Sequence, residues 1–471
     1  MSEESPKPQR ESFYSRLKGS GSHEGILINI FVVNFFYRIF GEGFRVLLIP
    51  YAEDVMQWSD YEFGLILSVG GYASMAIVFL LGIIVDIQFK RTTMIVGLVC
   101  TIVSAVIFTR MKIFALSILF YSFFAVGQQL MMISTNTFIA NETKRGEHRT
   151  FGFTGNQVTR GIANVAAPLI SMYLLTIDLP NIEYVEWVNW VFTIMAGFAL
   201  VSLVLVFTLK LVVEDTPKDE INYAEKLSED SCDEFTKFSE DKDGKKSVLG
   251  VQMSFGLGRM LMGFTSGVAI PFVGWYIYGD FISGKYNNAE EIWGWINSIH
   301  WAVLTLGYLF IGSFAEKIGK EFIVVVSWTL VIPSAVGIML ASGIYMATAF
   351  FIMRSFFAMS PGAAWNSFMY EWIPPKHRGK TLGLLQTGQR GMRATGTLLG
   401  GLAFAAFGPT LFPIAMTAYP IAGLLPLIQS KLVKKRLRSR REDKFELEKT
   451  EEEKPFTKDY PIGLDSDMNT K

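Results

Sequence analysis

The chain has few charged residues and very few residues that hold metals or form disulfides. Charged side chains make up 18% of its 471 residues, below the roughly 25% that is usual for soluble proteins. Its only cysteines, Cys100 in a predicted helix and Cys232 in a polar segment, are not expected to pair. The sequence contains no His-Glu-x-x-His, paired-cysteine or Gly-x-Ser-x-Gly motif. We therefore expect neither an enzyme nor a metal or cofactor site.

Hydrophobic residues, in contrast, make up 50% of the chain. They form stretches longer than the roughly 18 residues that indicate a transmembrane helix. This pattern predicts an all-α polytopic membrane protein with twelve spans. The predicted spans are 26–51, 61–86, 92–110, 113–140, 150–177, 187–211, 248–278, 291–315, 321–343, 346–372, 380–406 and 409–430.

Basic residues predict the orientation, because Lys and Arg accumulate in short loops on the cytoplasmic side. One set of loops is basic and contains Lys90, Arg91, Lys144, Arg145, Arg149, Lys317, Lys320, Lys376, Arg378 and Lys380. The opposite set is acidic and contains Glu53, Asp54, Asp60, Asp178, Glu183 and Glu186. We expect both termini to be cytoplasmic and the protein to lie in the cell membrane.

Three polar segments divide the chain into domains. Residues 212–247 hold twelve acids and six lysines, so they predict a solvated cytoplasmic linker. The segment 431–471 begins with clustered Lys and Arg, which either fix the topology or bind anionic lipids, and is then expected to be disordered. The predicted domains are an N-terminal tail (1–25), a six-helix bundle (26–211), the linker, a second six-helix bundle (248–430) and the C-terminal tail.

The two predicted bundles are an internal repeat. Arg38 precedes Pro50 by twelve residues, and Arg259 precedes Pro271 by the same interval. Ser122-Phe123-Phe124-Ala125 recurs 233 residues later as Ser355-Phe356-Phe357-Ala358. Because six spans separate the copies, both bundles have the same orientation and are related by a pseudo-twofold axis along the membrane normal. This symmetry predicts a solute site near the midplane between them.

A short motif follows the second and the eighth predicted spans. The first copy includes Gly82, Asp86, Lys90 and Arg91, and the second includes Gly312, Glu316, Lys317 and Lys320. The pair resembles the signature loop of the major facilitator superfamily, Gly-x-x-x-Asp-basic-x-Gly-basic-basic, with Ile87, Phe89, Glu316 and Glu321 as departures.

The resemblance covers about residues 26–430 and implies two six-helix bundles around a cavity that opens alternately to each side. It also implies that the signature loops latch the bundles together on the cytoplasmic side, with Arg145 and Arg378 as further partners. Alternatively, these charges only enforce the topology.

Ionisable groups far from the span ends are the candidate solute ligands, because each is costly there unless it is paired or wetted. Arg38, Glu42 and Arg45 share one helical face, and polar stripes mark the fifth and eleventh spans. The candidate solute-binding residues are Arg38, Arg45, Arg160, Arg259, Arg390, Arg393, Gln128, Gln157, Gln386 and Asn297. With Arg354, seven intramembrane arginines face one clear carboxylate, Glu42, which favours an anionic solute held by guanidinium groups.

Two residues are candidates for proton coupling. Glu42, the one clear deep acid, either carries a proton or is a permanently ionised partner of Arg38 and Arg45. His300 is a second candidate carrier, although a lone histidine in a span often has only a structural role.

The sequence thus predicts a secondary active transporter, a monomer without nucleic-acid partners, for a small anionic or polar solute. One alternative is a proton-coupled multidrug or metabolite efflux antiporter, although the drug-export signature fits the fifth span poorly. The other is a membrane receptor that kept the fold but lost transport.

Overall fold

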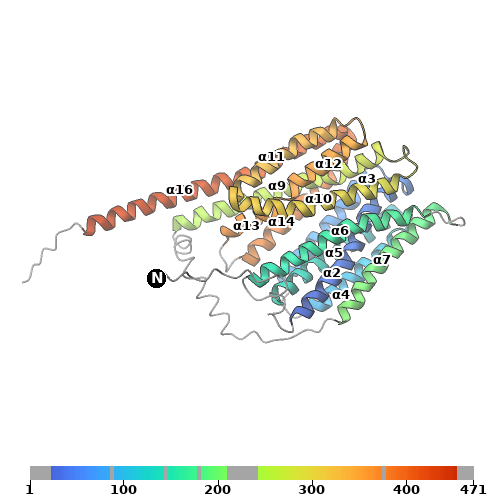
Figure 1. The fold of residues 1–471 in the computed structure, drawn as a ribbon, viewed down its shortest axis with the longest axis horizontal. Helices are drawn as coiled ribbons and strands as arrows, with labels where there is room; N and C mark the ends of the chain where they lie inside the picture. Colours follow the sequence, from blue (N-terminus) through green and yellow to red (C-terminus); the bar gives the residue numbers. More distant parts are fainter. Residues whose placement is uncertain are drawn as a thin grey trace, which may run out of the picture.

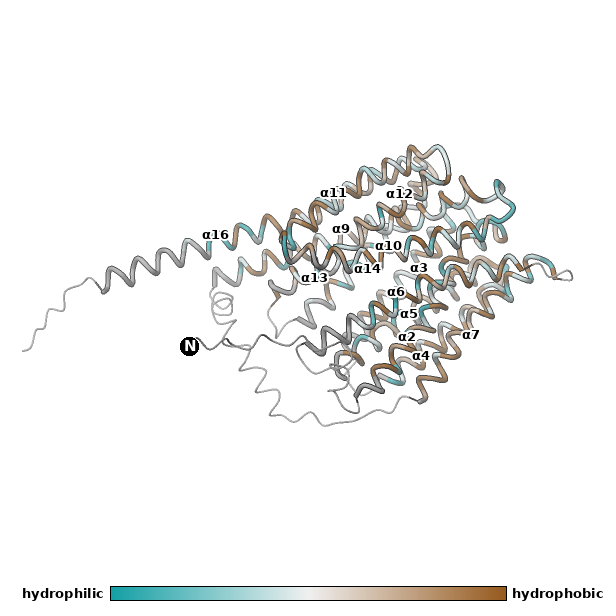
Figure 2. Tube along the Cα trace, in the orientation of Figure 1, coloured by the Kyte–Doolittle hydropathy of each residue, from teal (hydrophilic) through white to brown (hydrophobic). Residues whose placement is uncertain are grey.

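The computed structural model describes residues 23–84, 90–142, 147–177, 182–208, 242–373 and 378–452. All regular elements in these ranges are helices. Ten stretches within them are long and apolar enough to cross a membrane. Figure 2 shows hydrophobic residues along the helices, with hydrophilic ones concentrated at the connections. The chain is therefore a multi-pass, all-helical membrane protein.

The first half of the chain forms one group of helices. They are α2 (His23–Pro50), η1 (Tyr51–Val55), α3 (Asp60–Ile84), α4 (Lys90–Phe108), α5 (Phe114–Glu142), α6 (Glu147–Leu175) and α7 (Tyr184–Thr208). Each predicted span of this half coincides with one of these helices to within a few residues, and η1 continues α2 as one turn of π-helix. We call this group the N-terminal half.

The C-terminal half begins with α9 (Lys242–Phe281), α10 (Ala289–Ile318) and α11 (Lys320–Met339). The predicted tenth span is broken into α12 (Ile344–Met359) and α13 (Gly362–Glu371) at Ser360-Pro361, since proline cannot donate the backbone hydrogen bond that would continue α12. The remaining elements are α14 (Arg378–Phe407), η4 (Gly408–Thr410), α15 (Leu411–Met416) and α16 (Ala418–Glu452). We expected the last span to end at 430, but α16 continues to Glu452 and extends past the bundle (Figure 1).

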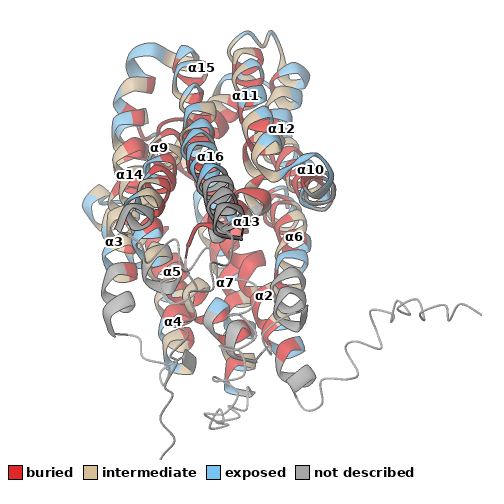
Figure 3. Cartoon of the chain, turned by 90° about the vertical axis from the view of Figure 1, so that its left-hand side faces the viewer, coloured by how far each residue is buried: buried red, intermediate tan, exposed pale blue. Residues whose placement is uncertain are grey.

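The long helices run side by side, so the molecule has two ends (Figure 1). We call the end where α2 begins and α16 protrudes the terminal end, and the opposite end the distal end. Figure 3 looks along the helices from the terminal end, with the C-terminal half above the N-terminal half. Two helix pairs join the halves, α3 with α14 on one side and α6 with α10 on the other.

Glycines allow α9 and α14 to pack backbone against backbone within the C-terminal half. A β-carbon at Gly400 would lie 2.7 Å from the carbonyl oxygen of Val268, and one at Gly396 would overlap the carbonyl oxygen of Phe264. In the N-terminal half, a β-carbon at Gly127 would lie 2.6 Å from the carbonyl oxygen of Gly97. Small residues bring helices together in this way in membranes, where van der Waals contact drives their association.

Candidate functional site

The candidate site starts from an ion pair on α2. Arg45 donates to Glu42 over 2.8 Å and to Oε1 of Gln128 on α5 over 2.6 Å. Glu42 is almost wholly buried, but the Arg45 side chain is 46% exposed. These contacts fix one edge of the Arg45 guanidinium while the rest remains accessible to solvent.

Arg393 presents a second accessible guanidinium from the opposite half. It lies at the middle of α14 and is exposed. Its charge interacts with Arg45, Glu42, Tyr121 and Tyr419, which belong to both halves. Two solvent-exposed arginines that interact from facing halves, well inside a membrane-spanning chain, must border a water-accessible space between those halves.

Arg38 and Arg160 add positive charge in the N-terminal half. Arg38 is buried, its Nε has no hydrogen-bond partner, and its charge interacts with Arg160, Glu42 and Arg45. Arg160 interacts in turn with Tyr308 of the C-terminal half. Glu42 is thus the one carboxylate among the electrostatic neighbours that the structure gives for Arg38.

Amides extend the polar lining toward the terminal end. Gln157 is exposed and lies one turn before Gly161, which packs against Thr305 of α10, so it belongs to the face that meets the other half. Gln386 is exposed one turn before Arg390, whose Nη1 is buried without a partner and whose charge interacts with Arg393. Both predicted stripes therefore include groups that can contact an aqueous solute.

Three predicted site residues lie elsewhere or are already engaged. Arg259 donates from Nη2 to Asn366 over 2.7 Å. Asn297 donates to the carbonyl oxygen of Trp293 on its own helix over 2.9 Å. His300 is buried against Phe351 and interacts with Arg354. The structure does not bring His300 together with Arg45 and Arg393.

The sequence analysis missed two tyrosines beside the central arginines. Tyr121 interacts with Arg45 and Arg393, and Tyr419 interacts with Arg393 and Arg354. Both lie in apolar stretches rich in aromatic residues, where a single hydroxyl does not stand out. The repeat offered one signal for Tyr121, because it directly precedes Ser122-Phe123-Phe124-Ala125 and Arg354 directly precedes the second copy of that segment.

Contacts between the halves close the space toward the distal end. Tyr278 and Ser283 donate to the two carboxylate oxygens of Asp54 over 2.5 and 2.9 Å, and Tyr184 donates to Glu290 over 3.0 Å.

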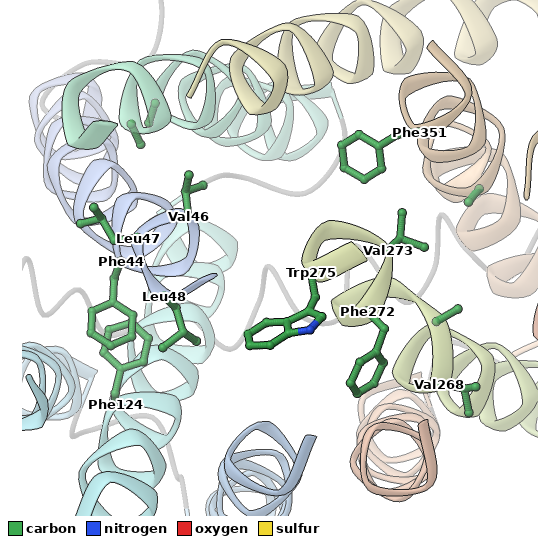
Figure 4. Close-up of a cluster of buried hydrophobic side chains, with 14 of the residues drawn as sticks. Phe44, Val46, Leu47, Leu48, Phe124, Val268, Phe272, Val273, Trp275 and Phe351 are labelled. Carbon is green, nitrogen blue, oxygen red and sulfur yellow. The ribbon is translucent and has the colours of Figure 1, made fainter. Parts of the chain in front are cut away.

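Closer to the middle, Phe63 stacks on Trp275 with ring centroids 4.5 Å apart. Figure 4 shows Trp275 between Leu48 of α2 and Phe272 of α9. The accessible arginines and amides lie on the terminal side of these contacts.

The structure describes only part of the predicted latch. Asp86 and Arg145 are not described, and the side chains of Lys90, Glu316 and Arg378 are not described either. Gly82 and Gly312 lie near the ends of α3 and α10. Arg91 donates to the carbonyl oxygen of Phe207 within its own half over 2.6 Å, and Lys317 is exposed. The latch stays a prediction.

Comparisons with known proteins define the family. The family model described as Major Facilitator Superfamily matches residues 30–254 and 255–463, whereas no curated protein sequence matches significantly. Among solved structures, a peptide transporter POT in complex with sulfate has a TM-score of 0.66 at 14% identity, covering 91% of this chain and 97% of that one.

Two further structures have the same fold. A POT family transporter in complex with a thioalcohol-conjugated peptide has a TM-score of 0.63 at 15% identity, with 86% of this chain and 96% of that chain covered. The nucleoside transporter NupG has a TM-score of 0.62 at 14% identity, with coverages of 87% and 99%. The two matched halves, the paired helix groups and the polar space between them lead to one conclusion: this chain belongs to the major facilitator superfamily and is a membrane transporter rather than an enzyme.

Proposed function

We propose that this protein is a secondary active transporter of a small anionic solute, which binds between Arg45 and Arg393. One observation carries the proposal: these two arginines, one from each half, are exposed to solvent in the interior of the molecule and interact with each other. Like charges held together repel, and an anion between them would remove that repulsion.

The side chains that line the space favour an anion with a planar carboxylate or a tetrahedral phosphate group. A guanidinium donates two parallel hydrogen bonds to a carboxylate or a phosphate. Glu42 already occupies one edge of Arg45, while Arg393 forms no ion pair with a carboxylate among the described residues. Gln157 and Gln386 supply neutral donors and acceptors for the rest of the solute.

The position of the contacts between the halves supports transport by alternating access. The halves meet at the distal end through Asp54, Tyr278 and Trp275, and the accessible polar groups lie on the terminal side. A solute that entered from the terminal end would leave only after the distal contacts separated. If the termini are cytoplasmic, as the basic loops predict, this conformation faces inward.

The short ion pair supports a fixed role for Glu42. Its carboxylate accepts from Arg45 over 2.8 Å, and a proton on Glu42 would weaken that contact. We propose that Glu42 orients Arg45 for the solute and does not itself carry the coupled proton.

Binding and flux together test the proposal. Purified protein is screened for thermal stabilisation by a panel of carboxylates and phosphate esters, because a ligand of the folded state raises the melting temperature. The ligand found is then used in liposome uptake assays. Arg45→Gln and Arg393→Gln should each weaken its binding by about tenfold or more, through the loss of charge-assisted hydrogen bonds.

Arg436→Gln is the matched control, because it removes an exposed arginine from the protruding part of α16. Unchanged binding in both Arg45→Gln and Arg393→Gln would refute the anion proposal. Binding without flux would indicate a receptor, and flux of apolar cations instead of anions would indicate a drug exporter.

A further inference from the structure

The repeat relates three positions that differ in chemistry between the halves. Equivalent positions follow from the sequence interval between the two copies of each repeated segment. Phe44 corresponds to Thr265 by the interval between Arg38 and Arg259, and Tyr121 corresponds to Arg354 by the interval between the Ser-Phe-Phe-Ala copies. Gly70 corresponds to His300 by the interval between the two signature loops. A trio of one glycine and two aromatic residues in one half is therefore replaced by histidine, threonine and arginine in the other.

In the N-terminal half the three residues pack against one another. A β-carbon at Gly70 would lie 2.7 Å from Cδ1 of Tyr121, so no larger residue fits there. The Phe44 ring lies 6.5 Å from that of Tyr121 and stacks on Phe124 at 3.9 Å. Figure 4 shows Phe44 and Phe124 against each other.

In the C-terminal half the same positions leave polar atoms unsatisfied. Arg354 is 2% exposed and donates from Nη1 to the neighbouring Ser355 hydroxyl over 3.1 Å, but its Nε and Nη2 are buried without a partner. Both ring nitrogens of buried His300 and the hydroxyl of buried Thr265 also lack partners. Native proteins rarely leave such groups without a partner, which is then an ordered water or a bound ion.

The surroundings of Arg354 do not compensate its charge. Its electrostatic neighbours among the described residues are Tyr419 and His300, neither of which is a carboxylate. Phe351 packs against His300 with ring centroids 4.8 Å apart, and Trp328 packs against Tyr419. A buried guanidinium in such an apolar shell requires a counter-charge.

We propose that Arg354, His300 and Thr265 form a second anion site, which binds a small monovalent inorganic anion such as chloride. Nε and Nη2 lie on one edge of the guanidinium, so they can donate two parallel hydrogen bonds to one anion. His300 can donate a third from its neutral ring, and Thr265 a fourth. None of these side chains has to take up a proton in order to donate these hydrogen bonds.

The size and burial of the site select the ion. Threonine is smaller than the phenylalanine at the equivalent position, and α9 and α12, which carry Thr265 and Arg354, are in contact. The site is closed to solvent, so the bound ion must lose its water, and this cost is smaller for a monovalent ion than for phosphate. The apolar shell offers few donors for a larger carboxylate.

The second site is separate from the central one. Buried Tyr419 interacts with both Arg354 and Arg393, but neither arginine is among the electrostatic neighbours of the other. The proposal does not depend on the identity of the transported solute, because chloride binding can be measured alone.

Equilibrium binding of radiolabelled chloride to the purified full-length protein tests the site. At constant ionic strength, with gluconate replacing chloride, we expect saturable binding of about one ion per chain and a rise in melting temperature with chloride. Absence of saturable binding would overturn the proposal.

Substitutions locate the ion. Arg354→Gln should weaken chloride binding by about tenfold or more, whereas Arg393→Gln should leave it within about twofold. The combination Thr265→Phe, His300→Gly and Arg354→Tyr copies the trio of the N-terminal half and should abolish chloride binding, with its melting temperature as the check that it is folded. Chloride binding that survives this combination, or that disappears in Arg393→Gln alone, would assign the ion to the central space and refute the second site.

Discussion

Removal of the Tyr278 hydroxyl should open the distal end. Tyr278 is 1% exposed and donates to Asp54 of the other half over 2.5 Å. A hydrogen bond to a charged acceptor contributes about 1.5–3 kcal/mol, but Asp54 is exposed to solvent, so we take about 1–2 kcal/mol. Because this bond exists only while the distal end is closed, Tyr278→Phe should shift the conformational equilibrium by about 5–30-fold.

Distances between spin labels measure this shift. Labels at Glu186→Cys and Tyr286→Cys, both exposed at the distal end of opposite halves, report on its closure in a background that carries Cys100→Ser and Cys232→Ser. In Tyr278→Phe we expect a second, longer distance to gain population.

Tyr276→Phe is the matched control. Tyr276 lies on the same helix, but its ring contacts are Phe281, Phe404 and Phe412 of its own half. The reasoning would be refuted if Tyr278→Phe left the distance distribution unchanged, or if Tyr276→Phe altered it equally.

Three further changes test other parts of the structure. Glu42→Gln should lower the free energy of unfolding by about 1–2 kcal/mol through loss of the Arg45 contact, as measured by thermal unfolding. Proteoliposomes with this variant should still accumulate solute along a pH gradient. Loss of accumulation with normal solute binding would make Glu42 the proton carrier. Gly64→Val should favour an open distal end, because a β-carbon there would lie 3.0 Å from the carbonyl oxygen of Thr397 in the other half; unchanged spin-label distances would count against this contact. Gly396→Val should destabilise the C-terminal half by about 1–3 kcal/mol through overpacking against Phe264, and an unaltered melting temperature would contradict the close approach of α9 and α14.

The helical membrane fold could be predicted from the sequence. Apolar stretches of sufficient length specify helices, because the bilayer offers the backbone no other hydrogen-bond partners. The copies around Arg38 and Arg259 and around Ser122 and Ser355 specified two related halves. These patterns can be read along the sequence without knowing any tertiary contact. The break at Pro361 and the length of α16 were missed, since apolar and basic runs do not mark where a helix bends or how far it continues.

Which of the buried charges lie together depends on how the helices pack. Arg45 and Arg393 are far apart in sequence and become neighbours because α2 and α14 face each other across the halves. Arg259 looked equivalent to Arg38, yet it donates to Asn366 of α13, and the residue with the same offset in the N-terminal half is Ile133, whose side chain cannot accept a hydrogen bond. Whether an arginine is wetted, paired or buried depends on what neighbouring helices place beside it, and a single sequence contains no direct record of those neighbours.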